Sequence, residues 1–205
     1  MKTLKNIISI AVAVFLIPVL ALAQSASYTF DADSSSIIVS GTSTLHDWEA
    51  NAEEVNMDIS FNPEMITQET PASPVSSLQL NVPVSSLESG KGKMNRKMKE
   101  ALKEDDHPQI MFGLVSAELA DSVSADGALN LTITGNLNIA GVEKEVSFPV
   151  TGIKEGENGY RFEGSYSLNM TNYKMDPPSV MFGAIKCGEE VMISFNILLT
   201  ANQNQ

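Results

Sequence analysis

Few side chains in this chain are of the types that do acid–base, nucleophilic or metal chemistry. There are two histidines, His46 and His107, far apart in the sequence, and one cysteine, Cys187. His46 is next to Asp47, but neighbouring residues of a strand point to opposite faces, so the two cannot act as a base and its orienting carboxylate. A zinc site needs three or four ligands, usually closely spaced, and the sequence has no such cluster. We therefore predict no catalytic residue, no metal site and no cofactor.

The role of His46 depends on which way its strand faces. His46 and Trp48 share an even-numbered face, whereas the apolar residues within 55–61 are odd-numbered. Either a bulge lies around 49–54, or His46 and Trp48 point outwards. We favour a structural histidine at the rim of the fold over one that contacts a polar group of a ligand. Cys187 lies in the turn-like Lys186-Cys187-Gly188, and we favour an inert small residue over a reactive thiol.

The N-terminus has the pattern of a secretory signal peptide over residues 1–23. Lys2 and Lys5 precede an apolar run, and Ala21-Leu22-Ala23 has the small-x-small form of a cleavage site. A membrane anchor is the alternative, but the apolar run is short for a span and Pro18 interrupts it. We predict cleavage near Ala23 and a periplasmic (or secreted) location.

The rest of the chain, 24–205, shows no linker, low-complexity run or second composition, and we predict that it forms one domain. The formal net charge of the whole sequence is −12, although the leader contributes two of the 13 basic residues. An acidic surface repels nucleic acid and anionic membranes. We therefore exclude a nucleic-acid partner and expect membrane contact to be transient at most.

The clearest pattern in the chain is the alternation of apolar and polar residues over 128–139. Leu129, Leu131 and Ile133 fall on one parity, and the asparagines and threonines between them fall on the other. A strand with this pattern has one apolar and one polar face. Similar patterns, separated by turn signals, predict strands at 27–33, 36–43, 46–60, 75–84, 109–120, 128–140, 142–151, 159–171 and 189–201.

Strands that each have a single apolar face must curl around one interior, as a barrel or a sandwich. Eight or nine strands at this spacing favour an up-and-down antiparallel barrel, so the predicted class is all-β. One segment differs, because Met94, Met98 and Leu102 are spaced by four and line one face of a helix within 88–106. We expect this helix to pack its apolar stripe on the barrel mouth. Its lysines and arginines would then face outwards, and a basic surface for a membrane or an anionic head group is the alternative.

Four stretches together resemble the YceI-like family of secreted, lipocalin-like barrels that bind polyisoprenoids. They are Ser40–Glu49 with its Leu-His-Asp-Trp segment, Met98–Phe112, Gly135–Val146 with its Ala-Gly-Val-Glu-Lys turn, and Asn169–Gly183. They occur in order across almost the whole chain. The resemblance implies an eight-stranded antiparallel lipocalin-like barrel capped by one α-helix. It also implies a lumen that takes a long isoprenoid tail, as of a quinone or a polyprenyl carrier.

The candidate ligand-binding residues are apolar or aromatic residues on the apolar parities of the predicted strands. For the lumen they are Leu131, Ile133, Phe148, Phe162, Tyr166, Leu168, Ile193 and Phe195, and for the lid Met94, Met98 and Leu102. Burial of an apolar chain requires shape and an oily wall rather than a polar motif, because the gain is about 25 cal/mol per Å² of apolar surface removed from water.

The function we predict is non-enzymatic binding, sequestration or carriage of a hydrophobic, isoprenoid-type lipid. The partner is then a small molecule, and a homodimer is left open. One alternative is a filled barrel that acts as an interaction or stress-related structural module and binds nothing in its lumen. A less favoured alternative is an enzyme that uses His46 with a nearby carboxylate.

Overall fold

The computed structural model describes residues 27–66, 72–119, 127–180 and 184–202, so the predicted leader lies outside the described residues. Most of the described chain is in strands, with one α-helix, α1 (Gly92–Ala101), and short 3-10 turns at Pro63–Met65, Val84–Ser86 and Met170–Tyr173. The strands are β1 (Tyr28–Ser43), β2 (Trp48–Ala52), β3 (Asn56–Phe61), β4 (Val75–Pro83), β5 (Leu87–Glu88), β6 (Gln109–Leu119), β7 (Leu129–Ile139), β8 (Val142–Glu155), β9 (Gly159–Asn169), β10 (Ser179–Val180) and β11 (Ile185–Ala201). No helix among these residues is long and apolar enough to cross a membrane.

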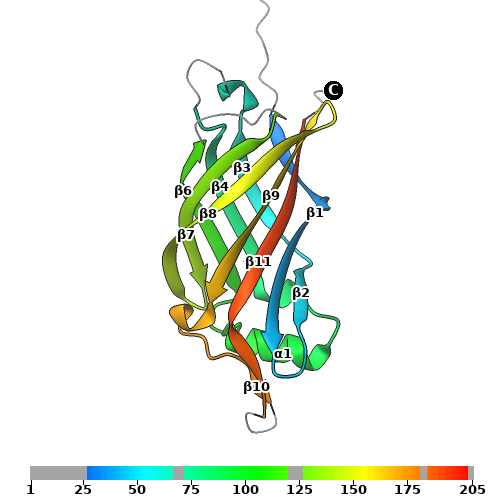
Figure 1. Ribbon diagram of the computed structural model, residues 1–205, viewed down its shortest axis with the longest axis vertical. Helices are drawn as coiled ribbons and strands as arrows, with labels where there is room; N and C mark the ends of the chain where they lie inside the picture. Colours follow the sequence, from blue (N-terminus) through cyan, green and yellow to red (C-terminus); the bar gives the residue numbers. More distant parts are fainter. Residues whose placement is uncertain (1–26, 67–71, 120–126, 181–183, 203–205) are drawn as a thin grey trace, which may run out of the picture.

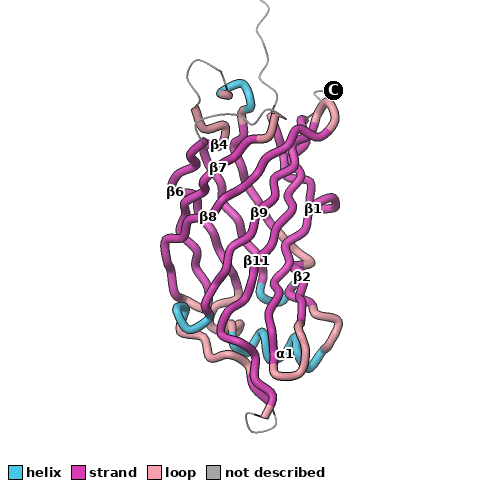
Figure 2. The backbone as a smooth tube through the Cα atoms, in the orientation of Figure 1, coloured by secondary structure: helices cyan, strands magenta, loops and turns pink. Residues whose placement is uncertain are grey.

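The strands form one antiparallel sheet that curls around a single interior (Figures 1 and 2). Its order is β3-β4-β6-β7-β8-β9-β11-β1-β2-β5, and β10 pairs with β11 outside this path. β2 and β3 follow one another in the chain, and they pair with β5 and β4 respectively. β2 and β3 can therefore be counted as one interrupted strand, and β4 and β5 as another. The described segments of the path therefore occupy eight strand positions. The predicted antiparallel, helix-capped barrel is confirmed, but its sheet has more strand segments than the eight expected.

The alternation in β7 produces the expected two faces. Leu129, Leu131, Ile133, Gly135, Leu137 and Ile139 are buried, and the residues of the other parity are half-buried or exposed. The buried residues of all the long strands form one hydrophobic cluster inside the barrel. At the end away from α1, this interior is closed by edge-to-face contacts among Tyr28, Phe61, Tyr160 and Phe162, with ring centroids 4.9–5.6 Å apart.

The barrel closes differently at its two ends. Near α1, β1 pairs with β2 through residues 38–41, and β2 pairs with β5. Towards the other end, no ladder joins β3 to the first half of β1 in the part of the chain that the structure describes. The Tyr28 ring of β1 instead meets the Phe61 ring of β3, with centroids 5.1 Å apart. We call this junction the β1–β3 seam.

The expected single strand at 46–60 is wrong, because the chain leaves the sheet between β2 and β3. Trp48 and Ala52 face inwards from β2, whereas Met57 and Ile59 face inwards from β3. The inward parity therefore changes from even to odd across 53–55. Trp48 points inwards, but the cause is a break between two strands rather than the expected bulge. Conversely, the strands expected at 27–33 and 36–43 are one strand, β1, with a register shift between Asp31 and Ser36.

The predicted helix within 88–106 is shorter than expected. Regular α-helix covers Gly92–Ala101, and Leu102 is its C-terminal cap. Lys103 then adopts a positive φ of 56°, a left-handed conformation that ends the helix. The Met94, Met98 and Leu102 stripe survives this shortening because all three residues still lie on the helix or at its cap.

Candidate ligand-binding cavity

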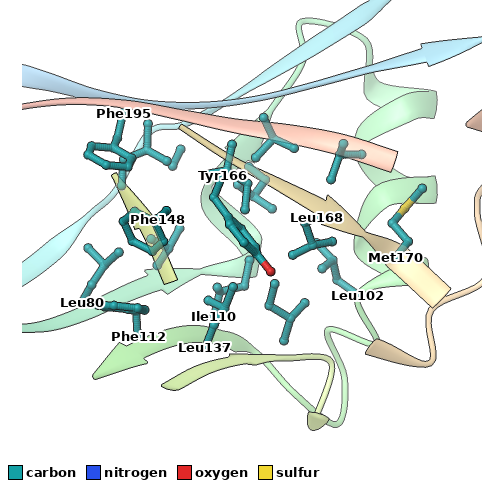
Figure 3. A pocket seen from close by; sticks show the side chains of 18 of the residues that line it. Leu80, Leu102, Ile110, Phe112, Leu137, Phe148, Tyr166, Leu168, Met170 and Phe195 are labelled. Carbon is teal, nitrogen blue, oxygen red and sulfur yellow. The ribbon is translucent and has the colours of Figure 1, made fainter. Parts of the chain in front are cut away.

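The barrel interior contains a cavity of about 260 Å³ between the aromatic cluster and α1. Its wall is almost entirely carbon, and Figure 3 shows aliphatic and aromatic side chains converging on it from several strands. Of the lining residues, only Trp48, Lys97, Tyr166 and Cys187 have side chains that can donate a hydrogen bond. Such a cavity is suited to an apolar molecule, whereas a filled barrel would have no such space.

All the residues chosen from the sequence lie in the wall of this cavity. They are Leu131, Ile133, Phe148, Phe162, Tyr166, Leu168, Ile193 and Phe195 from the strands, and Met94, Met98 and Leu102 from the helix and its cap. Parity alone selected them, because residues of one parity on a barrel strand share the inner face. Their contact with a ligand stays a prediction.

Three of the lining residues that can donate a hydrogen bond were not selected from the sequence. The direction of the Trp48 side chain could not be predicted, because the position where the inward face changes from even to odd residues was unknown. In the structure its indole Nε1 donates to the Thr42 carbonyl at 3.2 Å. Lys97 was assigned to the outer face of its helix, yet it reaches the cavity mouth. Cys187 was expected in a turn, but it is part of β11 and lines the cavity.

The Cys187 thiol is half-buried beside Trp48, and burial is the main cause of its raised pKa. The nucleophilic form of cysteine is the thiolate. A raised pKa therefore keeps this thiol protonated and unreactive at neutral pH.

Glycines keep aromatic rings flat against the cavity wall. Gly164 of β9 is paired with Phe195 of β11, and a Cβ added to Gly164 would collide with the Phe195 ring. Gly135 of β7 lies beneath the Phe112 ring in the same way. A glycine in a strand often marks such a close approach. Since each ring fills the space of a missing side chain, the centre of the barrel stays open.

The two histidines do not contribute to this cavity. His46 is exposed in the turn before β2, where its Nδ1 lies 2.8 Å from the Asp47 carbonyl oxygen. His107 lies against Gly141 in the β7–β8 turn. Within the described ranges, no three His, Cys, Asp or Glu side chains are close enough to hold a metal ion. His46 therefore occupies the rim, as the favoured interpretation expected.

The family is decided by a match over nearly all of the described barrel. The YceI-like domain model matches residues 28–199. This chain belongs to the YceI-like family. The matched residues run from the first residue of β1 almost to the end of β11, so they include every strand of the barrel and α1.

Solved structures have the same fold as this YceI-like chain at low sequence identity. BcnA from Burkholderia cenocepacia is 18% identical with a TM-score of 0.65, and the match covers 83% of this chain and 99% of BcnA. A polyisoprenoid binding domain from Saccharophagus degradans, implicated in plant cell wall breakdown, is 12% identical with a TM-score of 0.63, covering 86% and 99%. The YceI protein of Campylobacter jejuni is 14% identical with a TM-score of 0.57, covering 76% and 85%. No curated protein matches this chain.

The lid of this YceI-like barrel is attached by a buried polar contact. Asn95 of α1 is 9% exposed, and its side-chain oxygen accepts hydrogen bonds from the Ser89 amide at 2.9 Å and the Ser89 hydroxyl at 2.6 Å. Its amide group donates to the Glu88 carboxylate at the end of β5. A buried amide with both ends satisfied fixes orientation, so this contact sets how α1 lies across the mouth.

Three basic residues of the helix and the turn after it are held by contacts within the protein, two of them by the barrel. Lys99 donates to the Ser85 carbonyl at 2.7 Å, and Lys103 donates to the Lys174 carbonyl at 3.1 Å. Lys97 pairs with Glu100 at 2.6 Å on the same helix. These contacts favour a surface helix packed on the barrel over a basic surface for membranes.

The lid contact predicts a dependence of stability on pH. The Asn95 hydrogen bond, and next the Gly90 amide, lower the pKa of Glu88 below its usual 4.5. A carboxyl with a lowered folded pKa stabilises the fold above its unfolded pKa, and loses that contribution as the pH falls through the folded pKa. We expect Glu88→Gln to flatten the fall in the free energy of unfolding between about pH 5 and pH 3. Urea denaturation across this range measures it.

The control for this prediction is Glu157→Gln, in the exposed β8–β9 turn. The control should keep the acid dependence of the unaltered protein. An equal acid dependence in Glu88→Gln and the unaltered protein would show that the Glu88 contact does not stabilise the native state.

Proposed function

We propose that this chain binds the apolar tail of an isoprenoid-type lipid in its barrel cavity and sequesters or carries it, without catalysis. The observation that carries this proposal is the cavity inside the barrel, with a wall almost entirely of carbon. Membership of the YceI-like family supports it, as does the fold shared with a polyisoprenoid binding domain.

The physical driving force is the burial of apolar surface. Each Å² removed from water contributes about 25 cal/mol, so a chain of several isoprene units needs no specific polar contact to bind. Met94 and Met98 at the mouth suit a ligand of variable length, because methionine is unbranched and adapts to irregular shapes. A protein that covers such a tail would keep it soluble between membranes.

The proposed place of action is outside the cytoplasm, in the periplasm or beyond. This part of the proposal rests on the leader pattern at residues 1–23 and on the acidic composition. An acidic surface also suits a carrier that must leave anionic membranes after loading, since like charges repel at the membrane surface.

The test is native mass spectrometry, with organic extraction, of protein purified from its own host without detergent. We expect a co-purifying isoprenoid lipid in near-equimolar amount. A protein that is found apo, and keeps its apo mass after incubation with quinones and polyprenyl phosphates, would overturn the proposal.

A further inference from the structure

Among the described lining residues, Tyr166 points its hydroxyl into the cavity. Figure 3 shows the Tyr166 ring pointing away from β9 into the cavity, with its oxygen among aliphatic side chains. The other hydrogen-bonding side chains of the wall have protein neighbours, since Trp48 donates to the Thr42 carbonyl and Lys97 pairs with Glu100. The Cys187 thiol is a weak donor beside Trp48.

A second hydroxyl lies behind this one. Tyr173, in the 3-10 turn after β9, is 1% exposed, and its Oη has no hydrogen-bond partner among the described residues. Its pKa is raised, first by burial and then by the nearby Tyr166. Two phenols are therefore close together in an apolar interior. A buried hydroxyl without a partner destabilises the fold, so we ask what this pair could bind.

The wall beside Tyr166 is aromatic. The Phe148 ring lies 5.8 Å from each of the rings of Tyr166, Phe112 and Phe195, and the four rings come from β6, β8, β9 and β11. Aromatic rings favour offset or edge contacts with a further planar ring. A planar group that enters to this depth would meet aromatic faces and one hydroxyl donor.

We propose that Tyr166, with Tyr173 behind it, binds a carbonyl oxygen on the planar ring of the lipid, and so selects ring-carbonyl isoprenoids over hydrocarbons of similar length. Tyr166 touches the ligand and donates its O–H to the carbonyl. Tyr173 is a positioning residue: its hydroxyl, which has no partner among the described residues, would turn to donate to the Tyr166 oxygen once the carbonyl is bound. The inference rests on the proposed function and deepens it, because it assigns a specific contact inside the cavity to the polar ring of the lipid.

The test measures the affinity of two short-chain ligands by equilibrium dialysis, with organic extraction to quantify the bound ligand. One is a benzoquinone bearing two isoprene units, and the other is farnesene, an isoprenoid hydrocarbon. We expect Tyr166→Phe to weaken quinone binding about tenfold, the loss of one hydrogen bond, and to leave farnesene binding unchanged. Tyr173→Phe should weaken quinone binding by a smaller factor. Phenylalanine keeps the ring and the fold, and thermal unfolding of each variant checks that it does.

A spectroscopic measurement separates a hydrogen bond from a change of shape. The infrared carbonyl band of the bound quinone should lie at lower wavenumber than in hydrocarbon solvent, and should return towards the solvent value in Tyr166→Phe. An unshifted band, or equal weakening of quinone and farnesene by Tyr166→Phe, would overturn the inference. If neither probe binds the unaltered protein, the proposed function itself fails. If both bind and Tyr166→Phe changes neither affinity, only the inference fails.

Discussion

Replacing Ile193 with glutamate is expected to weaken isoprenoid binding at least about 30-fold, because a carboxyl group in the cavity wall must lose water when an apolar chain enters. Ile193 lies on β11 with its side chain in the cavity wall, and it is only half-buried. The fold should therefore tolerate the new side chain better than it would at a fully packed position. Equilibrium dialysis with farnesene measures the loss, and circular dichroism checks the fold.

The matched control is the neighbouring residue on the same strand. Met192 points to the outside and is 40% exposed. Met192→Glu adds the same charge to the same strand, and should leave binding unchanged. If Ile193→Glu folds and still binds farnesene as tightly as Met192→Glu does, the ligand does not occupy the barrel interior.

Truncation of Leu199 to alanine is expected to lower the free energy of unfolding by about 2–5 kcal/mol. Leu199 lies on β11 in the packed part of the barrel, is 0% exposed, and is paired with Phe30 of β1 and Tyr160 of β9. Removal of its side chain leaves a cavity that these strands cannot close without breaking their ladders. In a domain of this size, the midpoint of thermal unfolding should fall by roughly 5–15 °C.

The control for this prediction is an exposed leucine. Leu45 is 67% exposed in the turn before β2, so Leu45→Ala should change the free energy of unfolding by less than about 0.5 kcal/mol. Calorimetry on both variants decides the matter. Similar melting temperatures for the two variants would mean that the interior around Leu199 is loosely packed.

Most of what could be predicted about the interior came from whether a residue has an odd or an even position along its strand. In a barrel, the residues of one parity on a strand must share the inner face, so Leu131, Ile133 and Phe162 could be placed without coordinates. The same rule fails where the chain leaves the sheet, because a break of unknown length changes the parity. This is why the direction of Trp48 was ambiguous while that of Ile133 was not.

Other features depend on contacts that a linear pattern does not contain. Alternation does not distinguish a filled interior from an open one, since the Gly164–Phe195 and Gly135–Phe112 contacts join different strands. Tyr173 lies in a 3-10 turn, outside the period-2 pattern that selected Tyr166. Its place behind Tyr166 therefore depends on how the turn after β9 folds back.

The β1–β3 seam gives the barrel an adjustable circumference. A closed ring of ladders has a fixed girth, because the number of strands and their stagger determine its diameter. Among the described residues no ladder joins β3 to the first half of β1, so a widening of the wall at the contact between the Tyr28 and Phe61 rings would break no ladder there. A bulkier ligand could therefore be accommodated by separating the Tyr28 and Phe61 rings, while the ladders between the other strands stay intact.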